Sequence, residues 1–310
     1  MKEKVLICDS IHEDGIRKLR DAGFVVDEKP TITKEELVKV IGGYDAIVVR
    51  SRTKVTAEVL RATNNLKVAA RAGVGVDNID VKEAEARGVK VINTPEAPSV
   101  AVAELTMGFL LSLSRAIPMA DRKMKNGEWI KSALIGRELR GKTLGIVGFG
   151  RIGYQVAKRA KAFEMKILAY DVAIEKLRDS VKEAGAEAVP LQELLKRSDF
   201  ITLHVPLLPQ TTHMIGEKEI SVMKDGAYLI NTSRGGIVNE EALKKALKSE
   251  KLAGAALDVF EEEPPKDMSL SGLDNIVCTP HIGAQTEEAQ KEAGILVAEK
   301  LIEIFRGEKA

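Results

Sequence analysis

Three glycines near the middle of the chain, Gly148, Gly150 and Gly153, form the pattern G-x-G-x-x-G. The pattern follows the apolar run 143–147 and opens a stretch with helical periodicity, which is the context of a dinucleotide-binding turn. Backbone N–H groups and the helix dipole at such a turn can bind a pyrophosphate. The alternative is a tight structural turn, and the strand–turn–helix context favours the binding site.

Asp171 stands eighteen residues after Gly153, at the end of the next predicted strand, 166–170. A carboxylate there can accept hydrogen bonds from the ribose hydroxyls of a dinucleotide. Its negative charge would repel a 2′-phosphate, and no arginine follows it directly. These features predict NAD rather than NADP as the cofactor.

Other side chains with useful chemistry also stand at or just after the ends of predicted strands. They are His204, Arg234, Asp258 and His281. Because the carboxyl ends of parallel strands share one edge of an open sheet, and ligands bind at that edge, we expect them to converge with Gly148 and Asp171. A histidine there can act as a general acid or base, and a buried arginine needs an anion as its partner. The spacing does not tell which acid of 261–263 reaches His281.

In the first third of the chain, Arg50 and Arg52 follow the predicted strand 46–49. If the strand continues through them, both side chains point to one face, where two guanidinium groups suit a phosphate or a carboxylate. The alternative is a charged strand end in water. A glycine turn at Gly73 and Gly75 would let backbone N–H groups approach an anion closely.

Residues 136–143 also read G-x-x-x-x-G-K-T, but the pattern runs into a strand, whereas the phosphate loop of a nucleotide hydrolase links a strand to a helix. We therefore expect a solvated turn there. Two cysteines, Cys8 and Cys278, and four scattered histidines have no metal-ligand spacing. We expect no metal site and a reducing, cytoplasmic location.

Predicted strands and helices alternate along almost the whole chain, which is typical of parallel sheets covered by helices. The predicted strands are 4–8, 24–27, 46–49, 66–71, 89–92, 143–147, 166–170, 200–203, 228–230, 253–257 and 275–278. The predicted helices are 13–22, 33–41, 57–62, 81–87, 99–114, 152–163, 175–184, 192–197, 217–223, 240–248 and 286–306. We therefore predict an α/β fold of doubly wound parallel sheets, and 310 residues fit about two domains.

The helix 99–114 is apolar on nearly every face, so we expect it to pack between domains or subunits, with a dimer contact there. The 47 basic and 46 acidic residues give a net charge of +1, which offers no field for nucleic acid or an anionic membrane. No apolar stretch is long enough to cross a bilayer, and the first residues do not predict a signal peptide. We expect a small-molecule ligand and neither nucleic acid nor membrane as a partner.

Five segments resemble the D-2-hydroxyacid dehydrogenases, and the resemblance extends over nearly the whole chain. They are 71–78, 148–153, 231–236, 258–264 and 279–283. The resemblance implies two Rossmann- or flavodoxin-like domains with the active site in the cleft between them. It gives a substrate-binding domain at 1–97 and 283–310, and an NAD-binding domain at 98–282.

By this resemblance, Arg234, Glu263 and His281 form the catalytic set. His281 exchanges the proton on the C2 oxygen of the substrate, Glu263 supports the imidazole, and Arg234 holds the carboxylate. The strand ends and the resemblance together predict the NAD contacts Gly148, Gly150, Arg151, Ile152, Gly153, Asp171, His204, Val205, Pro206, Thr232, Ser233, Arg234, Asp258, His281, Gly283 and Ala284. The implied substrate contacts are Arg50, Arg52, Val74, Gly75 and Asn78, with both arginines near a phosphate.

Within the family, the sequence is most similar to members that oxidise D-3-phosphoglycerate with NAD, the first step of serine biosynthesis. A glyoxylate or hydroxypyruvate reductase, another D-2-hydroxyacid dehydrogenase, and an NAD-sensing corepressor or scaffold stay open as alternatives. Many members have a C-terminal regulatory domain that binds serine, and we expect none in this chain. We also expect a homodimer or a larger homo-oligomer.

Overall fold

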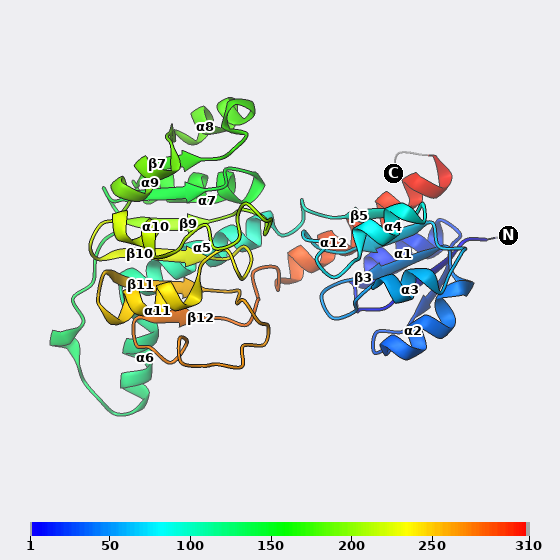
Figure 1. Cartoon of the computed structure of the whole chain (residues 1–310), viewed down its shortest axis with the longest axis horizontal. Coiled ribbons are helices and arrows are strands. Elements are labelled where there is room, and N and C mark those ends of the chain that lie inside the picture. Colours follow the sequence, from blue (N-terminus) through cyan, green and yellow to red (C-terminus); the bar gives the residue numbers. More distant parts are fainter. Residues whose placement is uncertain (1, 308–310) are drawn as a thin grey trace. The chain divides into compact units, whose positions relative to one another are not determined.

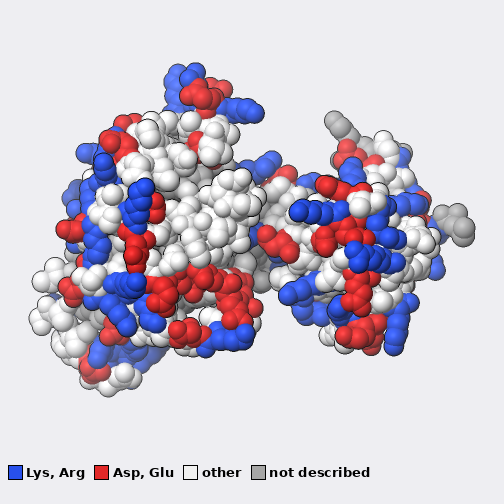
Figure 2. Space-filling model, viewed as in Figure 1, with Lys and Arg blue, Asp and Glu red and all other residues white. Residues whose placement is uncertain are grey.

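The computed structural model describes residues 2–307, which form two compact units (Figure 1). Unit 1 consists of the described residues up to Pro98 together with those from Ala284 onward. Unit 2 is the segment between them, Ser99–Gly283. Basic and acidic side chains are intermixed on the visible face of each unit, as expected from the balanced charge (Figure 2).

Unit 1 contains a five-stranded parallel sheet in the order β2-β1-β3-β4-β5. The strands are β1 (Lys4–Ile7), β2 (Val25–Glu28), β3 (Ala46–Val49), β4 (Val68–Arg71) and β5 (Lys90–Asn93). The helices are α1 (Glu13–Asp21), α2 (Lys34–Val40), α3 (Ala57–Arg61), α4 (Val81–Ala86) and α12 (Glu287–Arg306), with a 3-10 turn at Ile41–Gly43. Alternate residues of each strand face opposite sides, so Val5 and Ile7 pack in the cluster with α1 and α12, whereas Leu6 packs with α2 and α3.

Unit 2 contains a seven-stranded parallel sheet in the order β12-β11-β10-β9-β6-β7-β8. The strands are β6 (Thr143–Val147), β7 (Lys166–Tyr170), β8 (Glu187–Ala188), β9 (Phe200–Leu203), β10 (Ala227–Asn231), β11 (Leu252–Leu257) and β12 (Ile276–Cys278). The helices are α5 (Ser99–Ser114), α6 (Ile117–Lys125), α7 (Arg151–Ala162), α8 (Arg178–Ala184), α9 (Leu191–Arg197), α10 (Glu217–Val222) and α11 (Glu240–Lys248). Short 3-10 turns lie at Lys131–Ala133 and Ile174–Leu177.

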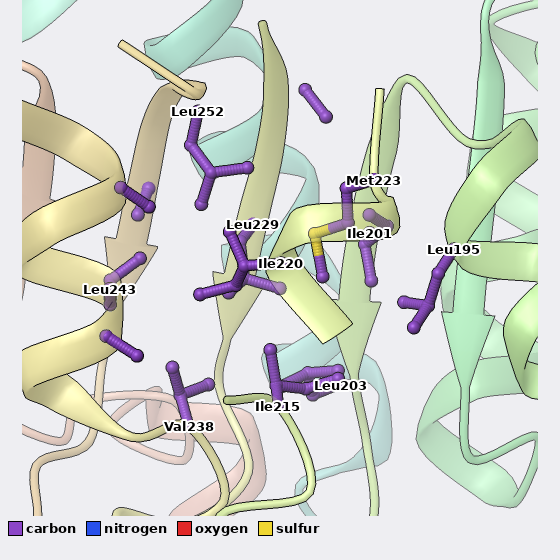
Figure 3. Close-up of a cluster of buried hydrophobic side chains, with 14 of the residues drawn as sticks. Leu195, Ile201, Leu203, Ile215, Ile220, Met223, Leu229, Val238, Leu243 and Leu252 are labelled. Atoms are coloured by element: carbon purple, nitrogen blue, oxygen red, sulfur yellow. The ribbon is translucent and has the colours of Figure 1, made fainter. Parts of the chain in front are cut away.

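Two hydrophobic clusters cover the faces of the unit 2 sheet. Figure 3 shows one of them, in which Leu229 of β10 and Ile201 of β9 pack against side chains such as Leu243 of α11 and Ile220 of α10. The opposite face packs on α5, α7 and α8. Because both faces are covered, the central strands are almost wholly apolar, as in other parallel sheets.

The predicted fold class is confirmed, with two parallel α/β sheets of five and seven strands. Strand β8 and helix α6 were not predicted from the sequence. Helix α5 was expected to pack between domains or subunits. Met107, Phe109 and Leu110 of α5 pack in the core of unit 2, so part of its apolar surface is covered within the chain, and the expected dimer contact there stays a prediction.

No single helix of residues 2–307 is long and apolar enough to cross a membrane. The bent pair of α5 and α6 passes that test by length and composition only. Ten of the sixteen residues of α5 are buried in the folded chain, which is the behaviour of a core helix.

Helices α1 and α12 of unit 1 cross at two glycines. A β-carbon on Gly15 of α1 would overlap the backbone carbonyl of Gly294 of α12. This close approach buries Ile16 and Leu19 of α1 against Val297 of α12 in one core cluster. The contact joins the last helix of the chain to the first one.

We predict that Gly15→Ala lowers the free energy of unfolding by about 1–3 kcal/mol, because the added methyl group separates the two helices. The matched control is Gly108→Ala in α5, where the added carbon has no atom within 4 Å beyond its chain neighbours and the backbone of its own helix. That change should leave stability unchanged or raise it by up to about 1 kcal/mol, through helix propensity. Equal denaturant midpoints for the two variants would contradict the tight crossing.

Candidate active site

The glycine turn joins β6 to α7 and depends on having no side chains. Gly148 has a φ of +92°, and a β-carbon there would lie 2.5 Å from the carbonyl oxygen of His204. A β-carbon on Gly153 would overlap the carbonyl oxygen of Gly148. Gly150 precedes α7, and no side chain in the described chain caps the start of this helix. An anionic group such as a pyrophosphate can therefore approach the backbone N–H groups at the N-terminus of the helix, as NAD binding requires.

Asp171 follows β7, the strand next to β6, and its carboxylate is tied to the glycine turn. Its Oδ2 accepts a hydrogen bond from Phe149 N at 2.9 Å, and its Oδ1 accepts one from Ala173 N at 2.8 Å. Each carboxylate oxygen can accept a further bond, so the acid can also receive ribose hydroxyls. These residues fit NAD and oppose a 2′-phosphate at the same position.

The strand order brings the predicted site residues of unit 2 to one sheet edge. Gly148, Asp171, His204, Arg234, Asp258 and His281 follow β6, β7, β9, β10, β11 and β12 in that order. All six strands are parallel members of one sheet, so their carboxyl ends share an edge. Strands β7 and β8 are added on one side of β6, and strands β9 to β12 on its other side. The position between β6 and β9 is therefore the topological switch point, where ligands of such folds bind.

Asp258 holds the turn that carries His281. Its side chain is 1% exposed, and its carboxylate accepts hydrogen bonds from Thr279 Oγ1 at 2.5 Å and from the backbone N–H groups of Ile282 and Gly283 at 2.8 Å. Its own carbonyl accepts His281 N at 2.8 Å. His281 has a φ of +53°, which is unfavourable for a residue with a β-carbon. The bonds to Asp258 on both sides of it keep the residue in that conformation.

Glu263 is the acid of the 261–263 turn that reaches His281. Its Oε2 lies 2.8 Å from Nδ1 of His281, and its Oε1 accepts a bond from Phe260 N at 3.2 Å. Burial opposes the charge of this carboxylate, but the hydrogen bond and charge of His281, the Phe260 N–H and nearby Arg234 outweigh it and lower the pKa of Glu263. An ionised carboxylate only accepts hydrogen bonds, so Nδ1 must carry a proton. Nε2 of His281 is then the nitrogen that can exchange a proton with a ligand.

Arg234 belongs to the same cluster through the turn after β10. Asn231, 2% exposed, donates from Nδ2 to Arg234 O at 2.8 Å and accepts from Ser233 N at 3.0 Å. The backbone at Gly235 packs so tightly on Phe260 O that no β-carbon fits between them. This packing brings Arg234 near enough to Glu263 to lower the pKa of that carboxyl group. The structure thus brings Arg234, Glu263 and His281 together.

His204 is a neutral group beneath this edge. Its Nε2 lies 3.0 Å from the buried hydroxyl of Thr202, and burial lowers the pKa of His204 to about 3. Its Nδ1 is buried and has no hydrogen-bond partner among the described residues. Next to it in sequence, Val205 is half-buried and Pro206 is exposed. An unpartnered buried nitrogen at a switch point is consistent with a ligand contact.

The other predicted NAD contacts of unit 2 lie on the same loops. Arg151 and Ile152 open α7, and Thr232 and Ser233 lie in the turn after β10. Gly283 has its N–H bonded to Asp258, and no larger residue fits easily there because Val102 and Asp258 lie against it. The chain returns to unit 1 at Ala284, the residue after Gly283. Both carboxylate oxygens of Asp258 already accept hydrogen bonds from other residues of the chain, which its position in the sequence did not indicate.

In unit 1, the predicted substrate residues lie on two loops after β3 and β4. The strand β3 ends at Val49, so the condition on which Arg50 and Arg52 would share one strand face is not met. Arg50 donates towards Ser10 O at 3.3 Å, whereas Arg52 donates to Cys8 O at 2.6 Å and Ile32 O at 3.1 Å. The two guanidinium groups therefore reach different parts of the chain.

The second loop carries Val74, Gly75 and Asn78. The carbonyl oxygens of Val74 and Gly75 accept hydrogen bonds from Asn93 and Arg71, so the loop is held by side chains of the neighbouring strands. Asn78 donates from Nδ2 to Arg50 O at 2.9 Å and to Thr53 O at 2.6 Å. Its Oδ1 is buried without a partner among the described residues.

One residue of this region was missed. Asp9 follows β1, is 5% exposed, and accepts hydrogen bonds from Arg50 N at 2.6 Å and Thr53 N at 3.2 Å. The rule that selected Asp171 and Asp258, an acid just after a buried strand, also selects Asp9. In the part of the chain that the structure describes, no cluster of three or more His, Cys, Asp or Glu could hold a metal ion.

Comparisons with known proteins agree with this geometry. Residues 107–283 match the family described as D-isomer specific 2-hydroxyacid dehydrogenase, NAD binding domain. The chain is 53% identical to D-3-phosphoglycerate dehydrogenase of Methanocaldococcus jannaschii over 99% of its own length, but it spans only 58% of that relative. It is 52% identical to hydroxypyruvate reductase of Thermotoga maritima, over 96% of this chain and 97% of that one. Among solved structures, D-lactate dehydrogenase of Aquifex aeolicus complexed with NAD and lactic acid is 32% identical with a TM-score of 0.84, over 98% of this chain and 96% of that one.

Proposed function

The chain belongs to the D-isomer specific 2-hydroxyacid dehydrogenases, and from this membership we propose that it oxidises D-3-phosphoglycerate to 3-phosphohydroxypyruvate with NAD, the first step of serine biosynthesis. The observation that carries the reaction type is the 2.8 Å contact between Glu263 and His281 at the edge that also carries the glycine turn. Unit 2 is the NAD-binding domain, and unit 1 binds the substrate.

Each catalytic side chain has its own role in this proposal. Arg234 holds the substrate carboxylate and polarises the C2 oxygen. Nε2 of His281 accepts the proton of the C2 hydroxyl as the C–O bond becomes a carbonyl. Glu263 offsets the positive charge that the imidazole then carries. Bound NAD supplies the acceptor for the hydride that leaves C2.

The substrate assignment rests on two supports. D-3-phosphoglycerate dehydrogenases are the relatives with 53% and 47% identity. In unit 1, Arg50 is half-buried at the end of β3 and can bind a phosphate. Hydroxypyruvate reduction is the second candidate, because the Thermotoga maritima reductase matches this chain along almost its full length.

The substrate panel that tests the proposal compares D-3-phosphoglycerate with D-glycerate, which lacks only the phosphate, in the presence of NAD. We expect kcat/KM to be about 10- to 100-fold higher for the phosphorylated acid, the value of one charge-assisted contact. A preference for D-glycerate, or for hydroxypyruvate with NADH, would assign the reductase function instead. Failure to convert any 2-hydroxy acid, with NAD still bound, would point to an NAD-sensing corepressor or scaffold.

The role of Glu263 is tested by Glu263→Gln, which keeps the shape of the side chain and removes its charge. We expect kcat/KM for the oxidation to fall about 10- to 100-fold. The acidic limb of its pH profile should also move, because the ionised Glu263 carboxylate that pairs with Nδ1 of His281, and whose own pKa this contact lowers, is absent. Glu262→Gln is the matched control, since Glu262 lies in the same turn but pairs with Lys266. An unmoved limb in Glu263→Gln would contradict the pairing.

We also propose that two copies of the chain associate through the segment after α5. Helix α6 and the loop after it project from the sheet of unit 2, and α6 buries none of its residues (Figure 1). This projecting segment exposes Ile117, Met124, Trp129 and Ile135, the last two by 76% and 91%. Exposed apolar side chains in such number within one segment are typical of a protein interface.

Wild-type chain should therefore have about twice the mass of one 33.7 kDa chain in light scattering. Trp129→Glu, which introduces a charge into the projecting segment, should shift the protein towards monomer. The control is Met268→Glu, a change at another exposed apolar residue, 60% exposed, outside this segment. A monomeric wild type, or an equal shift in both variants, would contradict this interface.

A further inference from the structure

Unit 1 has a topological switch point of its own. Its strand order β2-β1-β3-β4-β5 reverses between β1 and β3, and ligands of sheets with this order bind outside the carboxyl ends of those two strands. Asp9 follows β1 and Arg50 follows β3, so both lie at this point. An acidic and a basic residue therefore follow the two strands where the fold itself favours a ligand.

The turn Arg50–Thr53 is held there by side chains rather than by its own hydrogen bonds. Asp9 Oδ2 accepts from Arg50 N and Thr53 N, and Asp9 Oδ1 accepts from Thr53 Oγ1 at 2.7 Å. The backbone carbonyl oxygens of the same two residues, Arg50 and Thr53, accept hydrogen bonds from Nδ2 of Asn78. Moving or neutralising Asp9 would release both ends of the turn.

Arg52 is the charged partner of Asp9. Its Nη2 lies 3.2 Å from Asp9 Oδ1 and donates to Cys8 O, while its Nη1 donates to Ile32 O. Half of this side chain is exposed, yet both terminal nitrogens already have acceptors within the chain. An anion could use them only by replacing these bonds. A buried carboxylate is stabilised by such a partner, so removing Arg52 takes away the ion pair of Asp9.

Arg50 is in the opposite situation. Its guanidinium makes two long contacts, to Ser10 O at 3.3 Å and to Gln290 Oε1 at 3.5 Å. Within residues 2–307, no carboxylate lies at ion-pair distance from it. Its charge is nevertheless partly withdrawn from water, and this burial lowers the pKa of Arg50. A half-buried cation with weak partners at a switch point is a group that an anion would stabilise.

We propose that the two arginines have separate roles: Arg50 binds the anionic end of the substrate, and Arg52 is a positioning residue that holds the Arg50 turn through its ion pair with Asp9. The assignment rests on the proposed phosphorylated substrate and replaces the expectation that both arginines contact the phosphate. Asp9 is the second positioning residue. Neither Asp9 nor Arg52 touches the substrate.

Separate roles have a kinetic consequence that a shared role lacks. If Arg52 acts only by placing Arg50, its removal has no further effect once Arg50 is absent. Arg50→Ala should raise KM for D-3-phosphoglycerate about 10- to 100-fold, with KM for D-glycerate and kcat nearly unchanged. Arg52→Ala should raise the same KM, and the double variant should equal Arg50→Ala within about twofold. Independent, multiplying increases would overturn the proposal.

Stability without any ligand gives a readout that phosphate binding does not influence. Arg52→Ala and Asp9→Asn should each lower the thermal unfolding midpoint, whereas Arg50→Ala should leave it unchanged or raise it. If Arg52→Ala does not fold, Arg52→Lys keeps the charge but loses the two-nitrogen fork, and should lower the midpoint less. An unchanged midpoint in both Arg52 variants, together with a higher KM, would overturn the proposal and make Arg52 a ligand.

Inorganic phosphate separates this proposal from the choice of substrate. Used as a probe, it should raise the unfolding midpoint of the wild type and of Arg52→Lys more than that of Arg50→Ala. That result supports the two roles even if the substrate panel favours an unphosphorylated acid and the proposed function fails. An equal rise in Arg50→Ala would overturn the assignment of the anion site to Arg50.

Discussion

Three buried or half-buried aspartates at strand ends organise both ligand-binding edges of this chain. Each carboxylate accepts backbone N–H groups of a turn that follows the neighbouring strand: Asp9 holds the turn after β3, Asp171 the turn after β6, and Asp258 the turn after β12. The carboxyl ends of parallel strands have N–H and C=O groups that the sheet no longer pairs. A short acid on the adjacent strand accepts hydrogen bonds from such N–H groups and fixes the loop at the same time.

This arrangement explains how an unfavourable backbone can persist at His281, the proposed base. His281 has a positive φ, and Asp258 accepts hydrogen bonds from His281 N through its carbonyl and from Thr279 Oγ1, Ile282 N and Gly283 N through its carboxylate. With the backbone fixed, the contact of Nδ1 with Glu263 sets the orientation of the imidazole. The backbone conformation and the ring orientation of this residue thus come from two different acids, one buried and one at the surface.

The sequence was sufficient for the alternation of elements and for the residues at strand ends, because both follow from local pattern and from the geometry of parallel sheets. It could not give the partners of long side chains. Nothing in the spacing of Arg50 and Arg52 indicates that one pairs with Asp9, some forty residues earlier, and the other does not. Nor was α6 predicted, a helix of nine residues that buries none of them in the folded chain.

Recognition at these edges must therefore use the groups that remain after the turns have been satisfied. Among the described residues, the carboxylate of Asp258 and the terminal nitrogens of Arg52 are already committed to the chain. Nε2 of His281, Nδ1 of His204, Oδ1 of Asn78, the carboxylate of Asp171 and the guanidinium of Arg50 are among the polar groups with capacity left. When a ligand replaces a hydrogen bond within the chain, the net gain in binding free energy is small. When it provides a partner for a half-buried and poorly bonded group, most of the free energy of the new hydrogen bond contributes to binding. For an arginine beside an acid, the number of uncommitted donors is thus a better guide to anion binding than the presence of the charge.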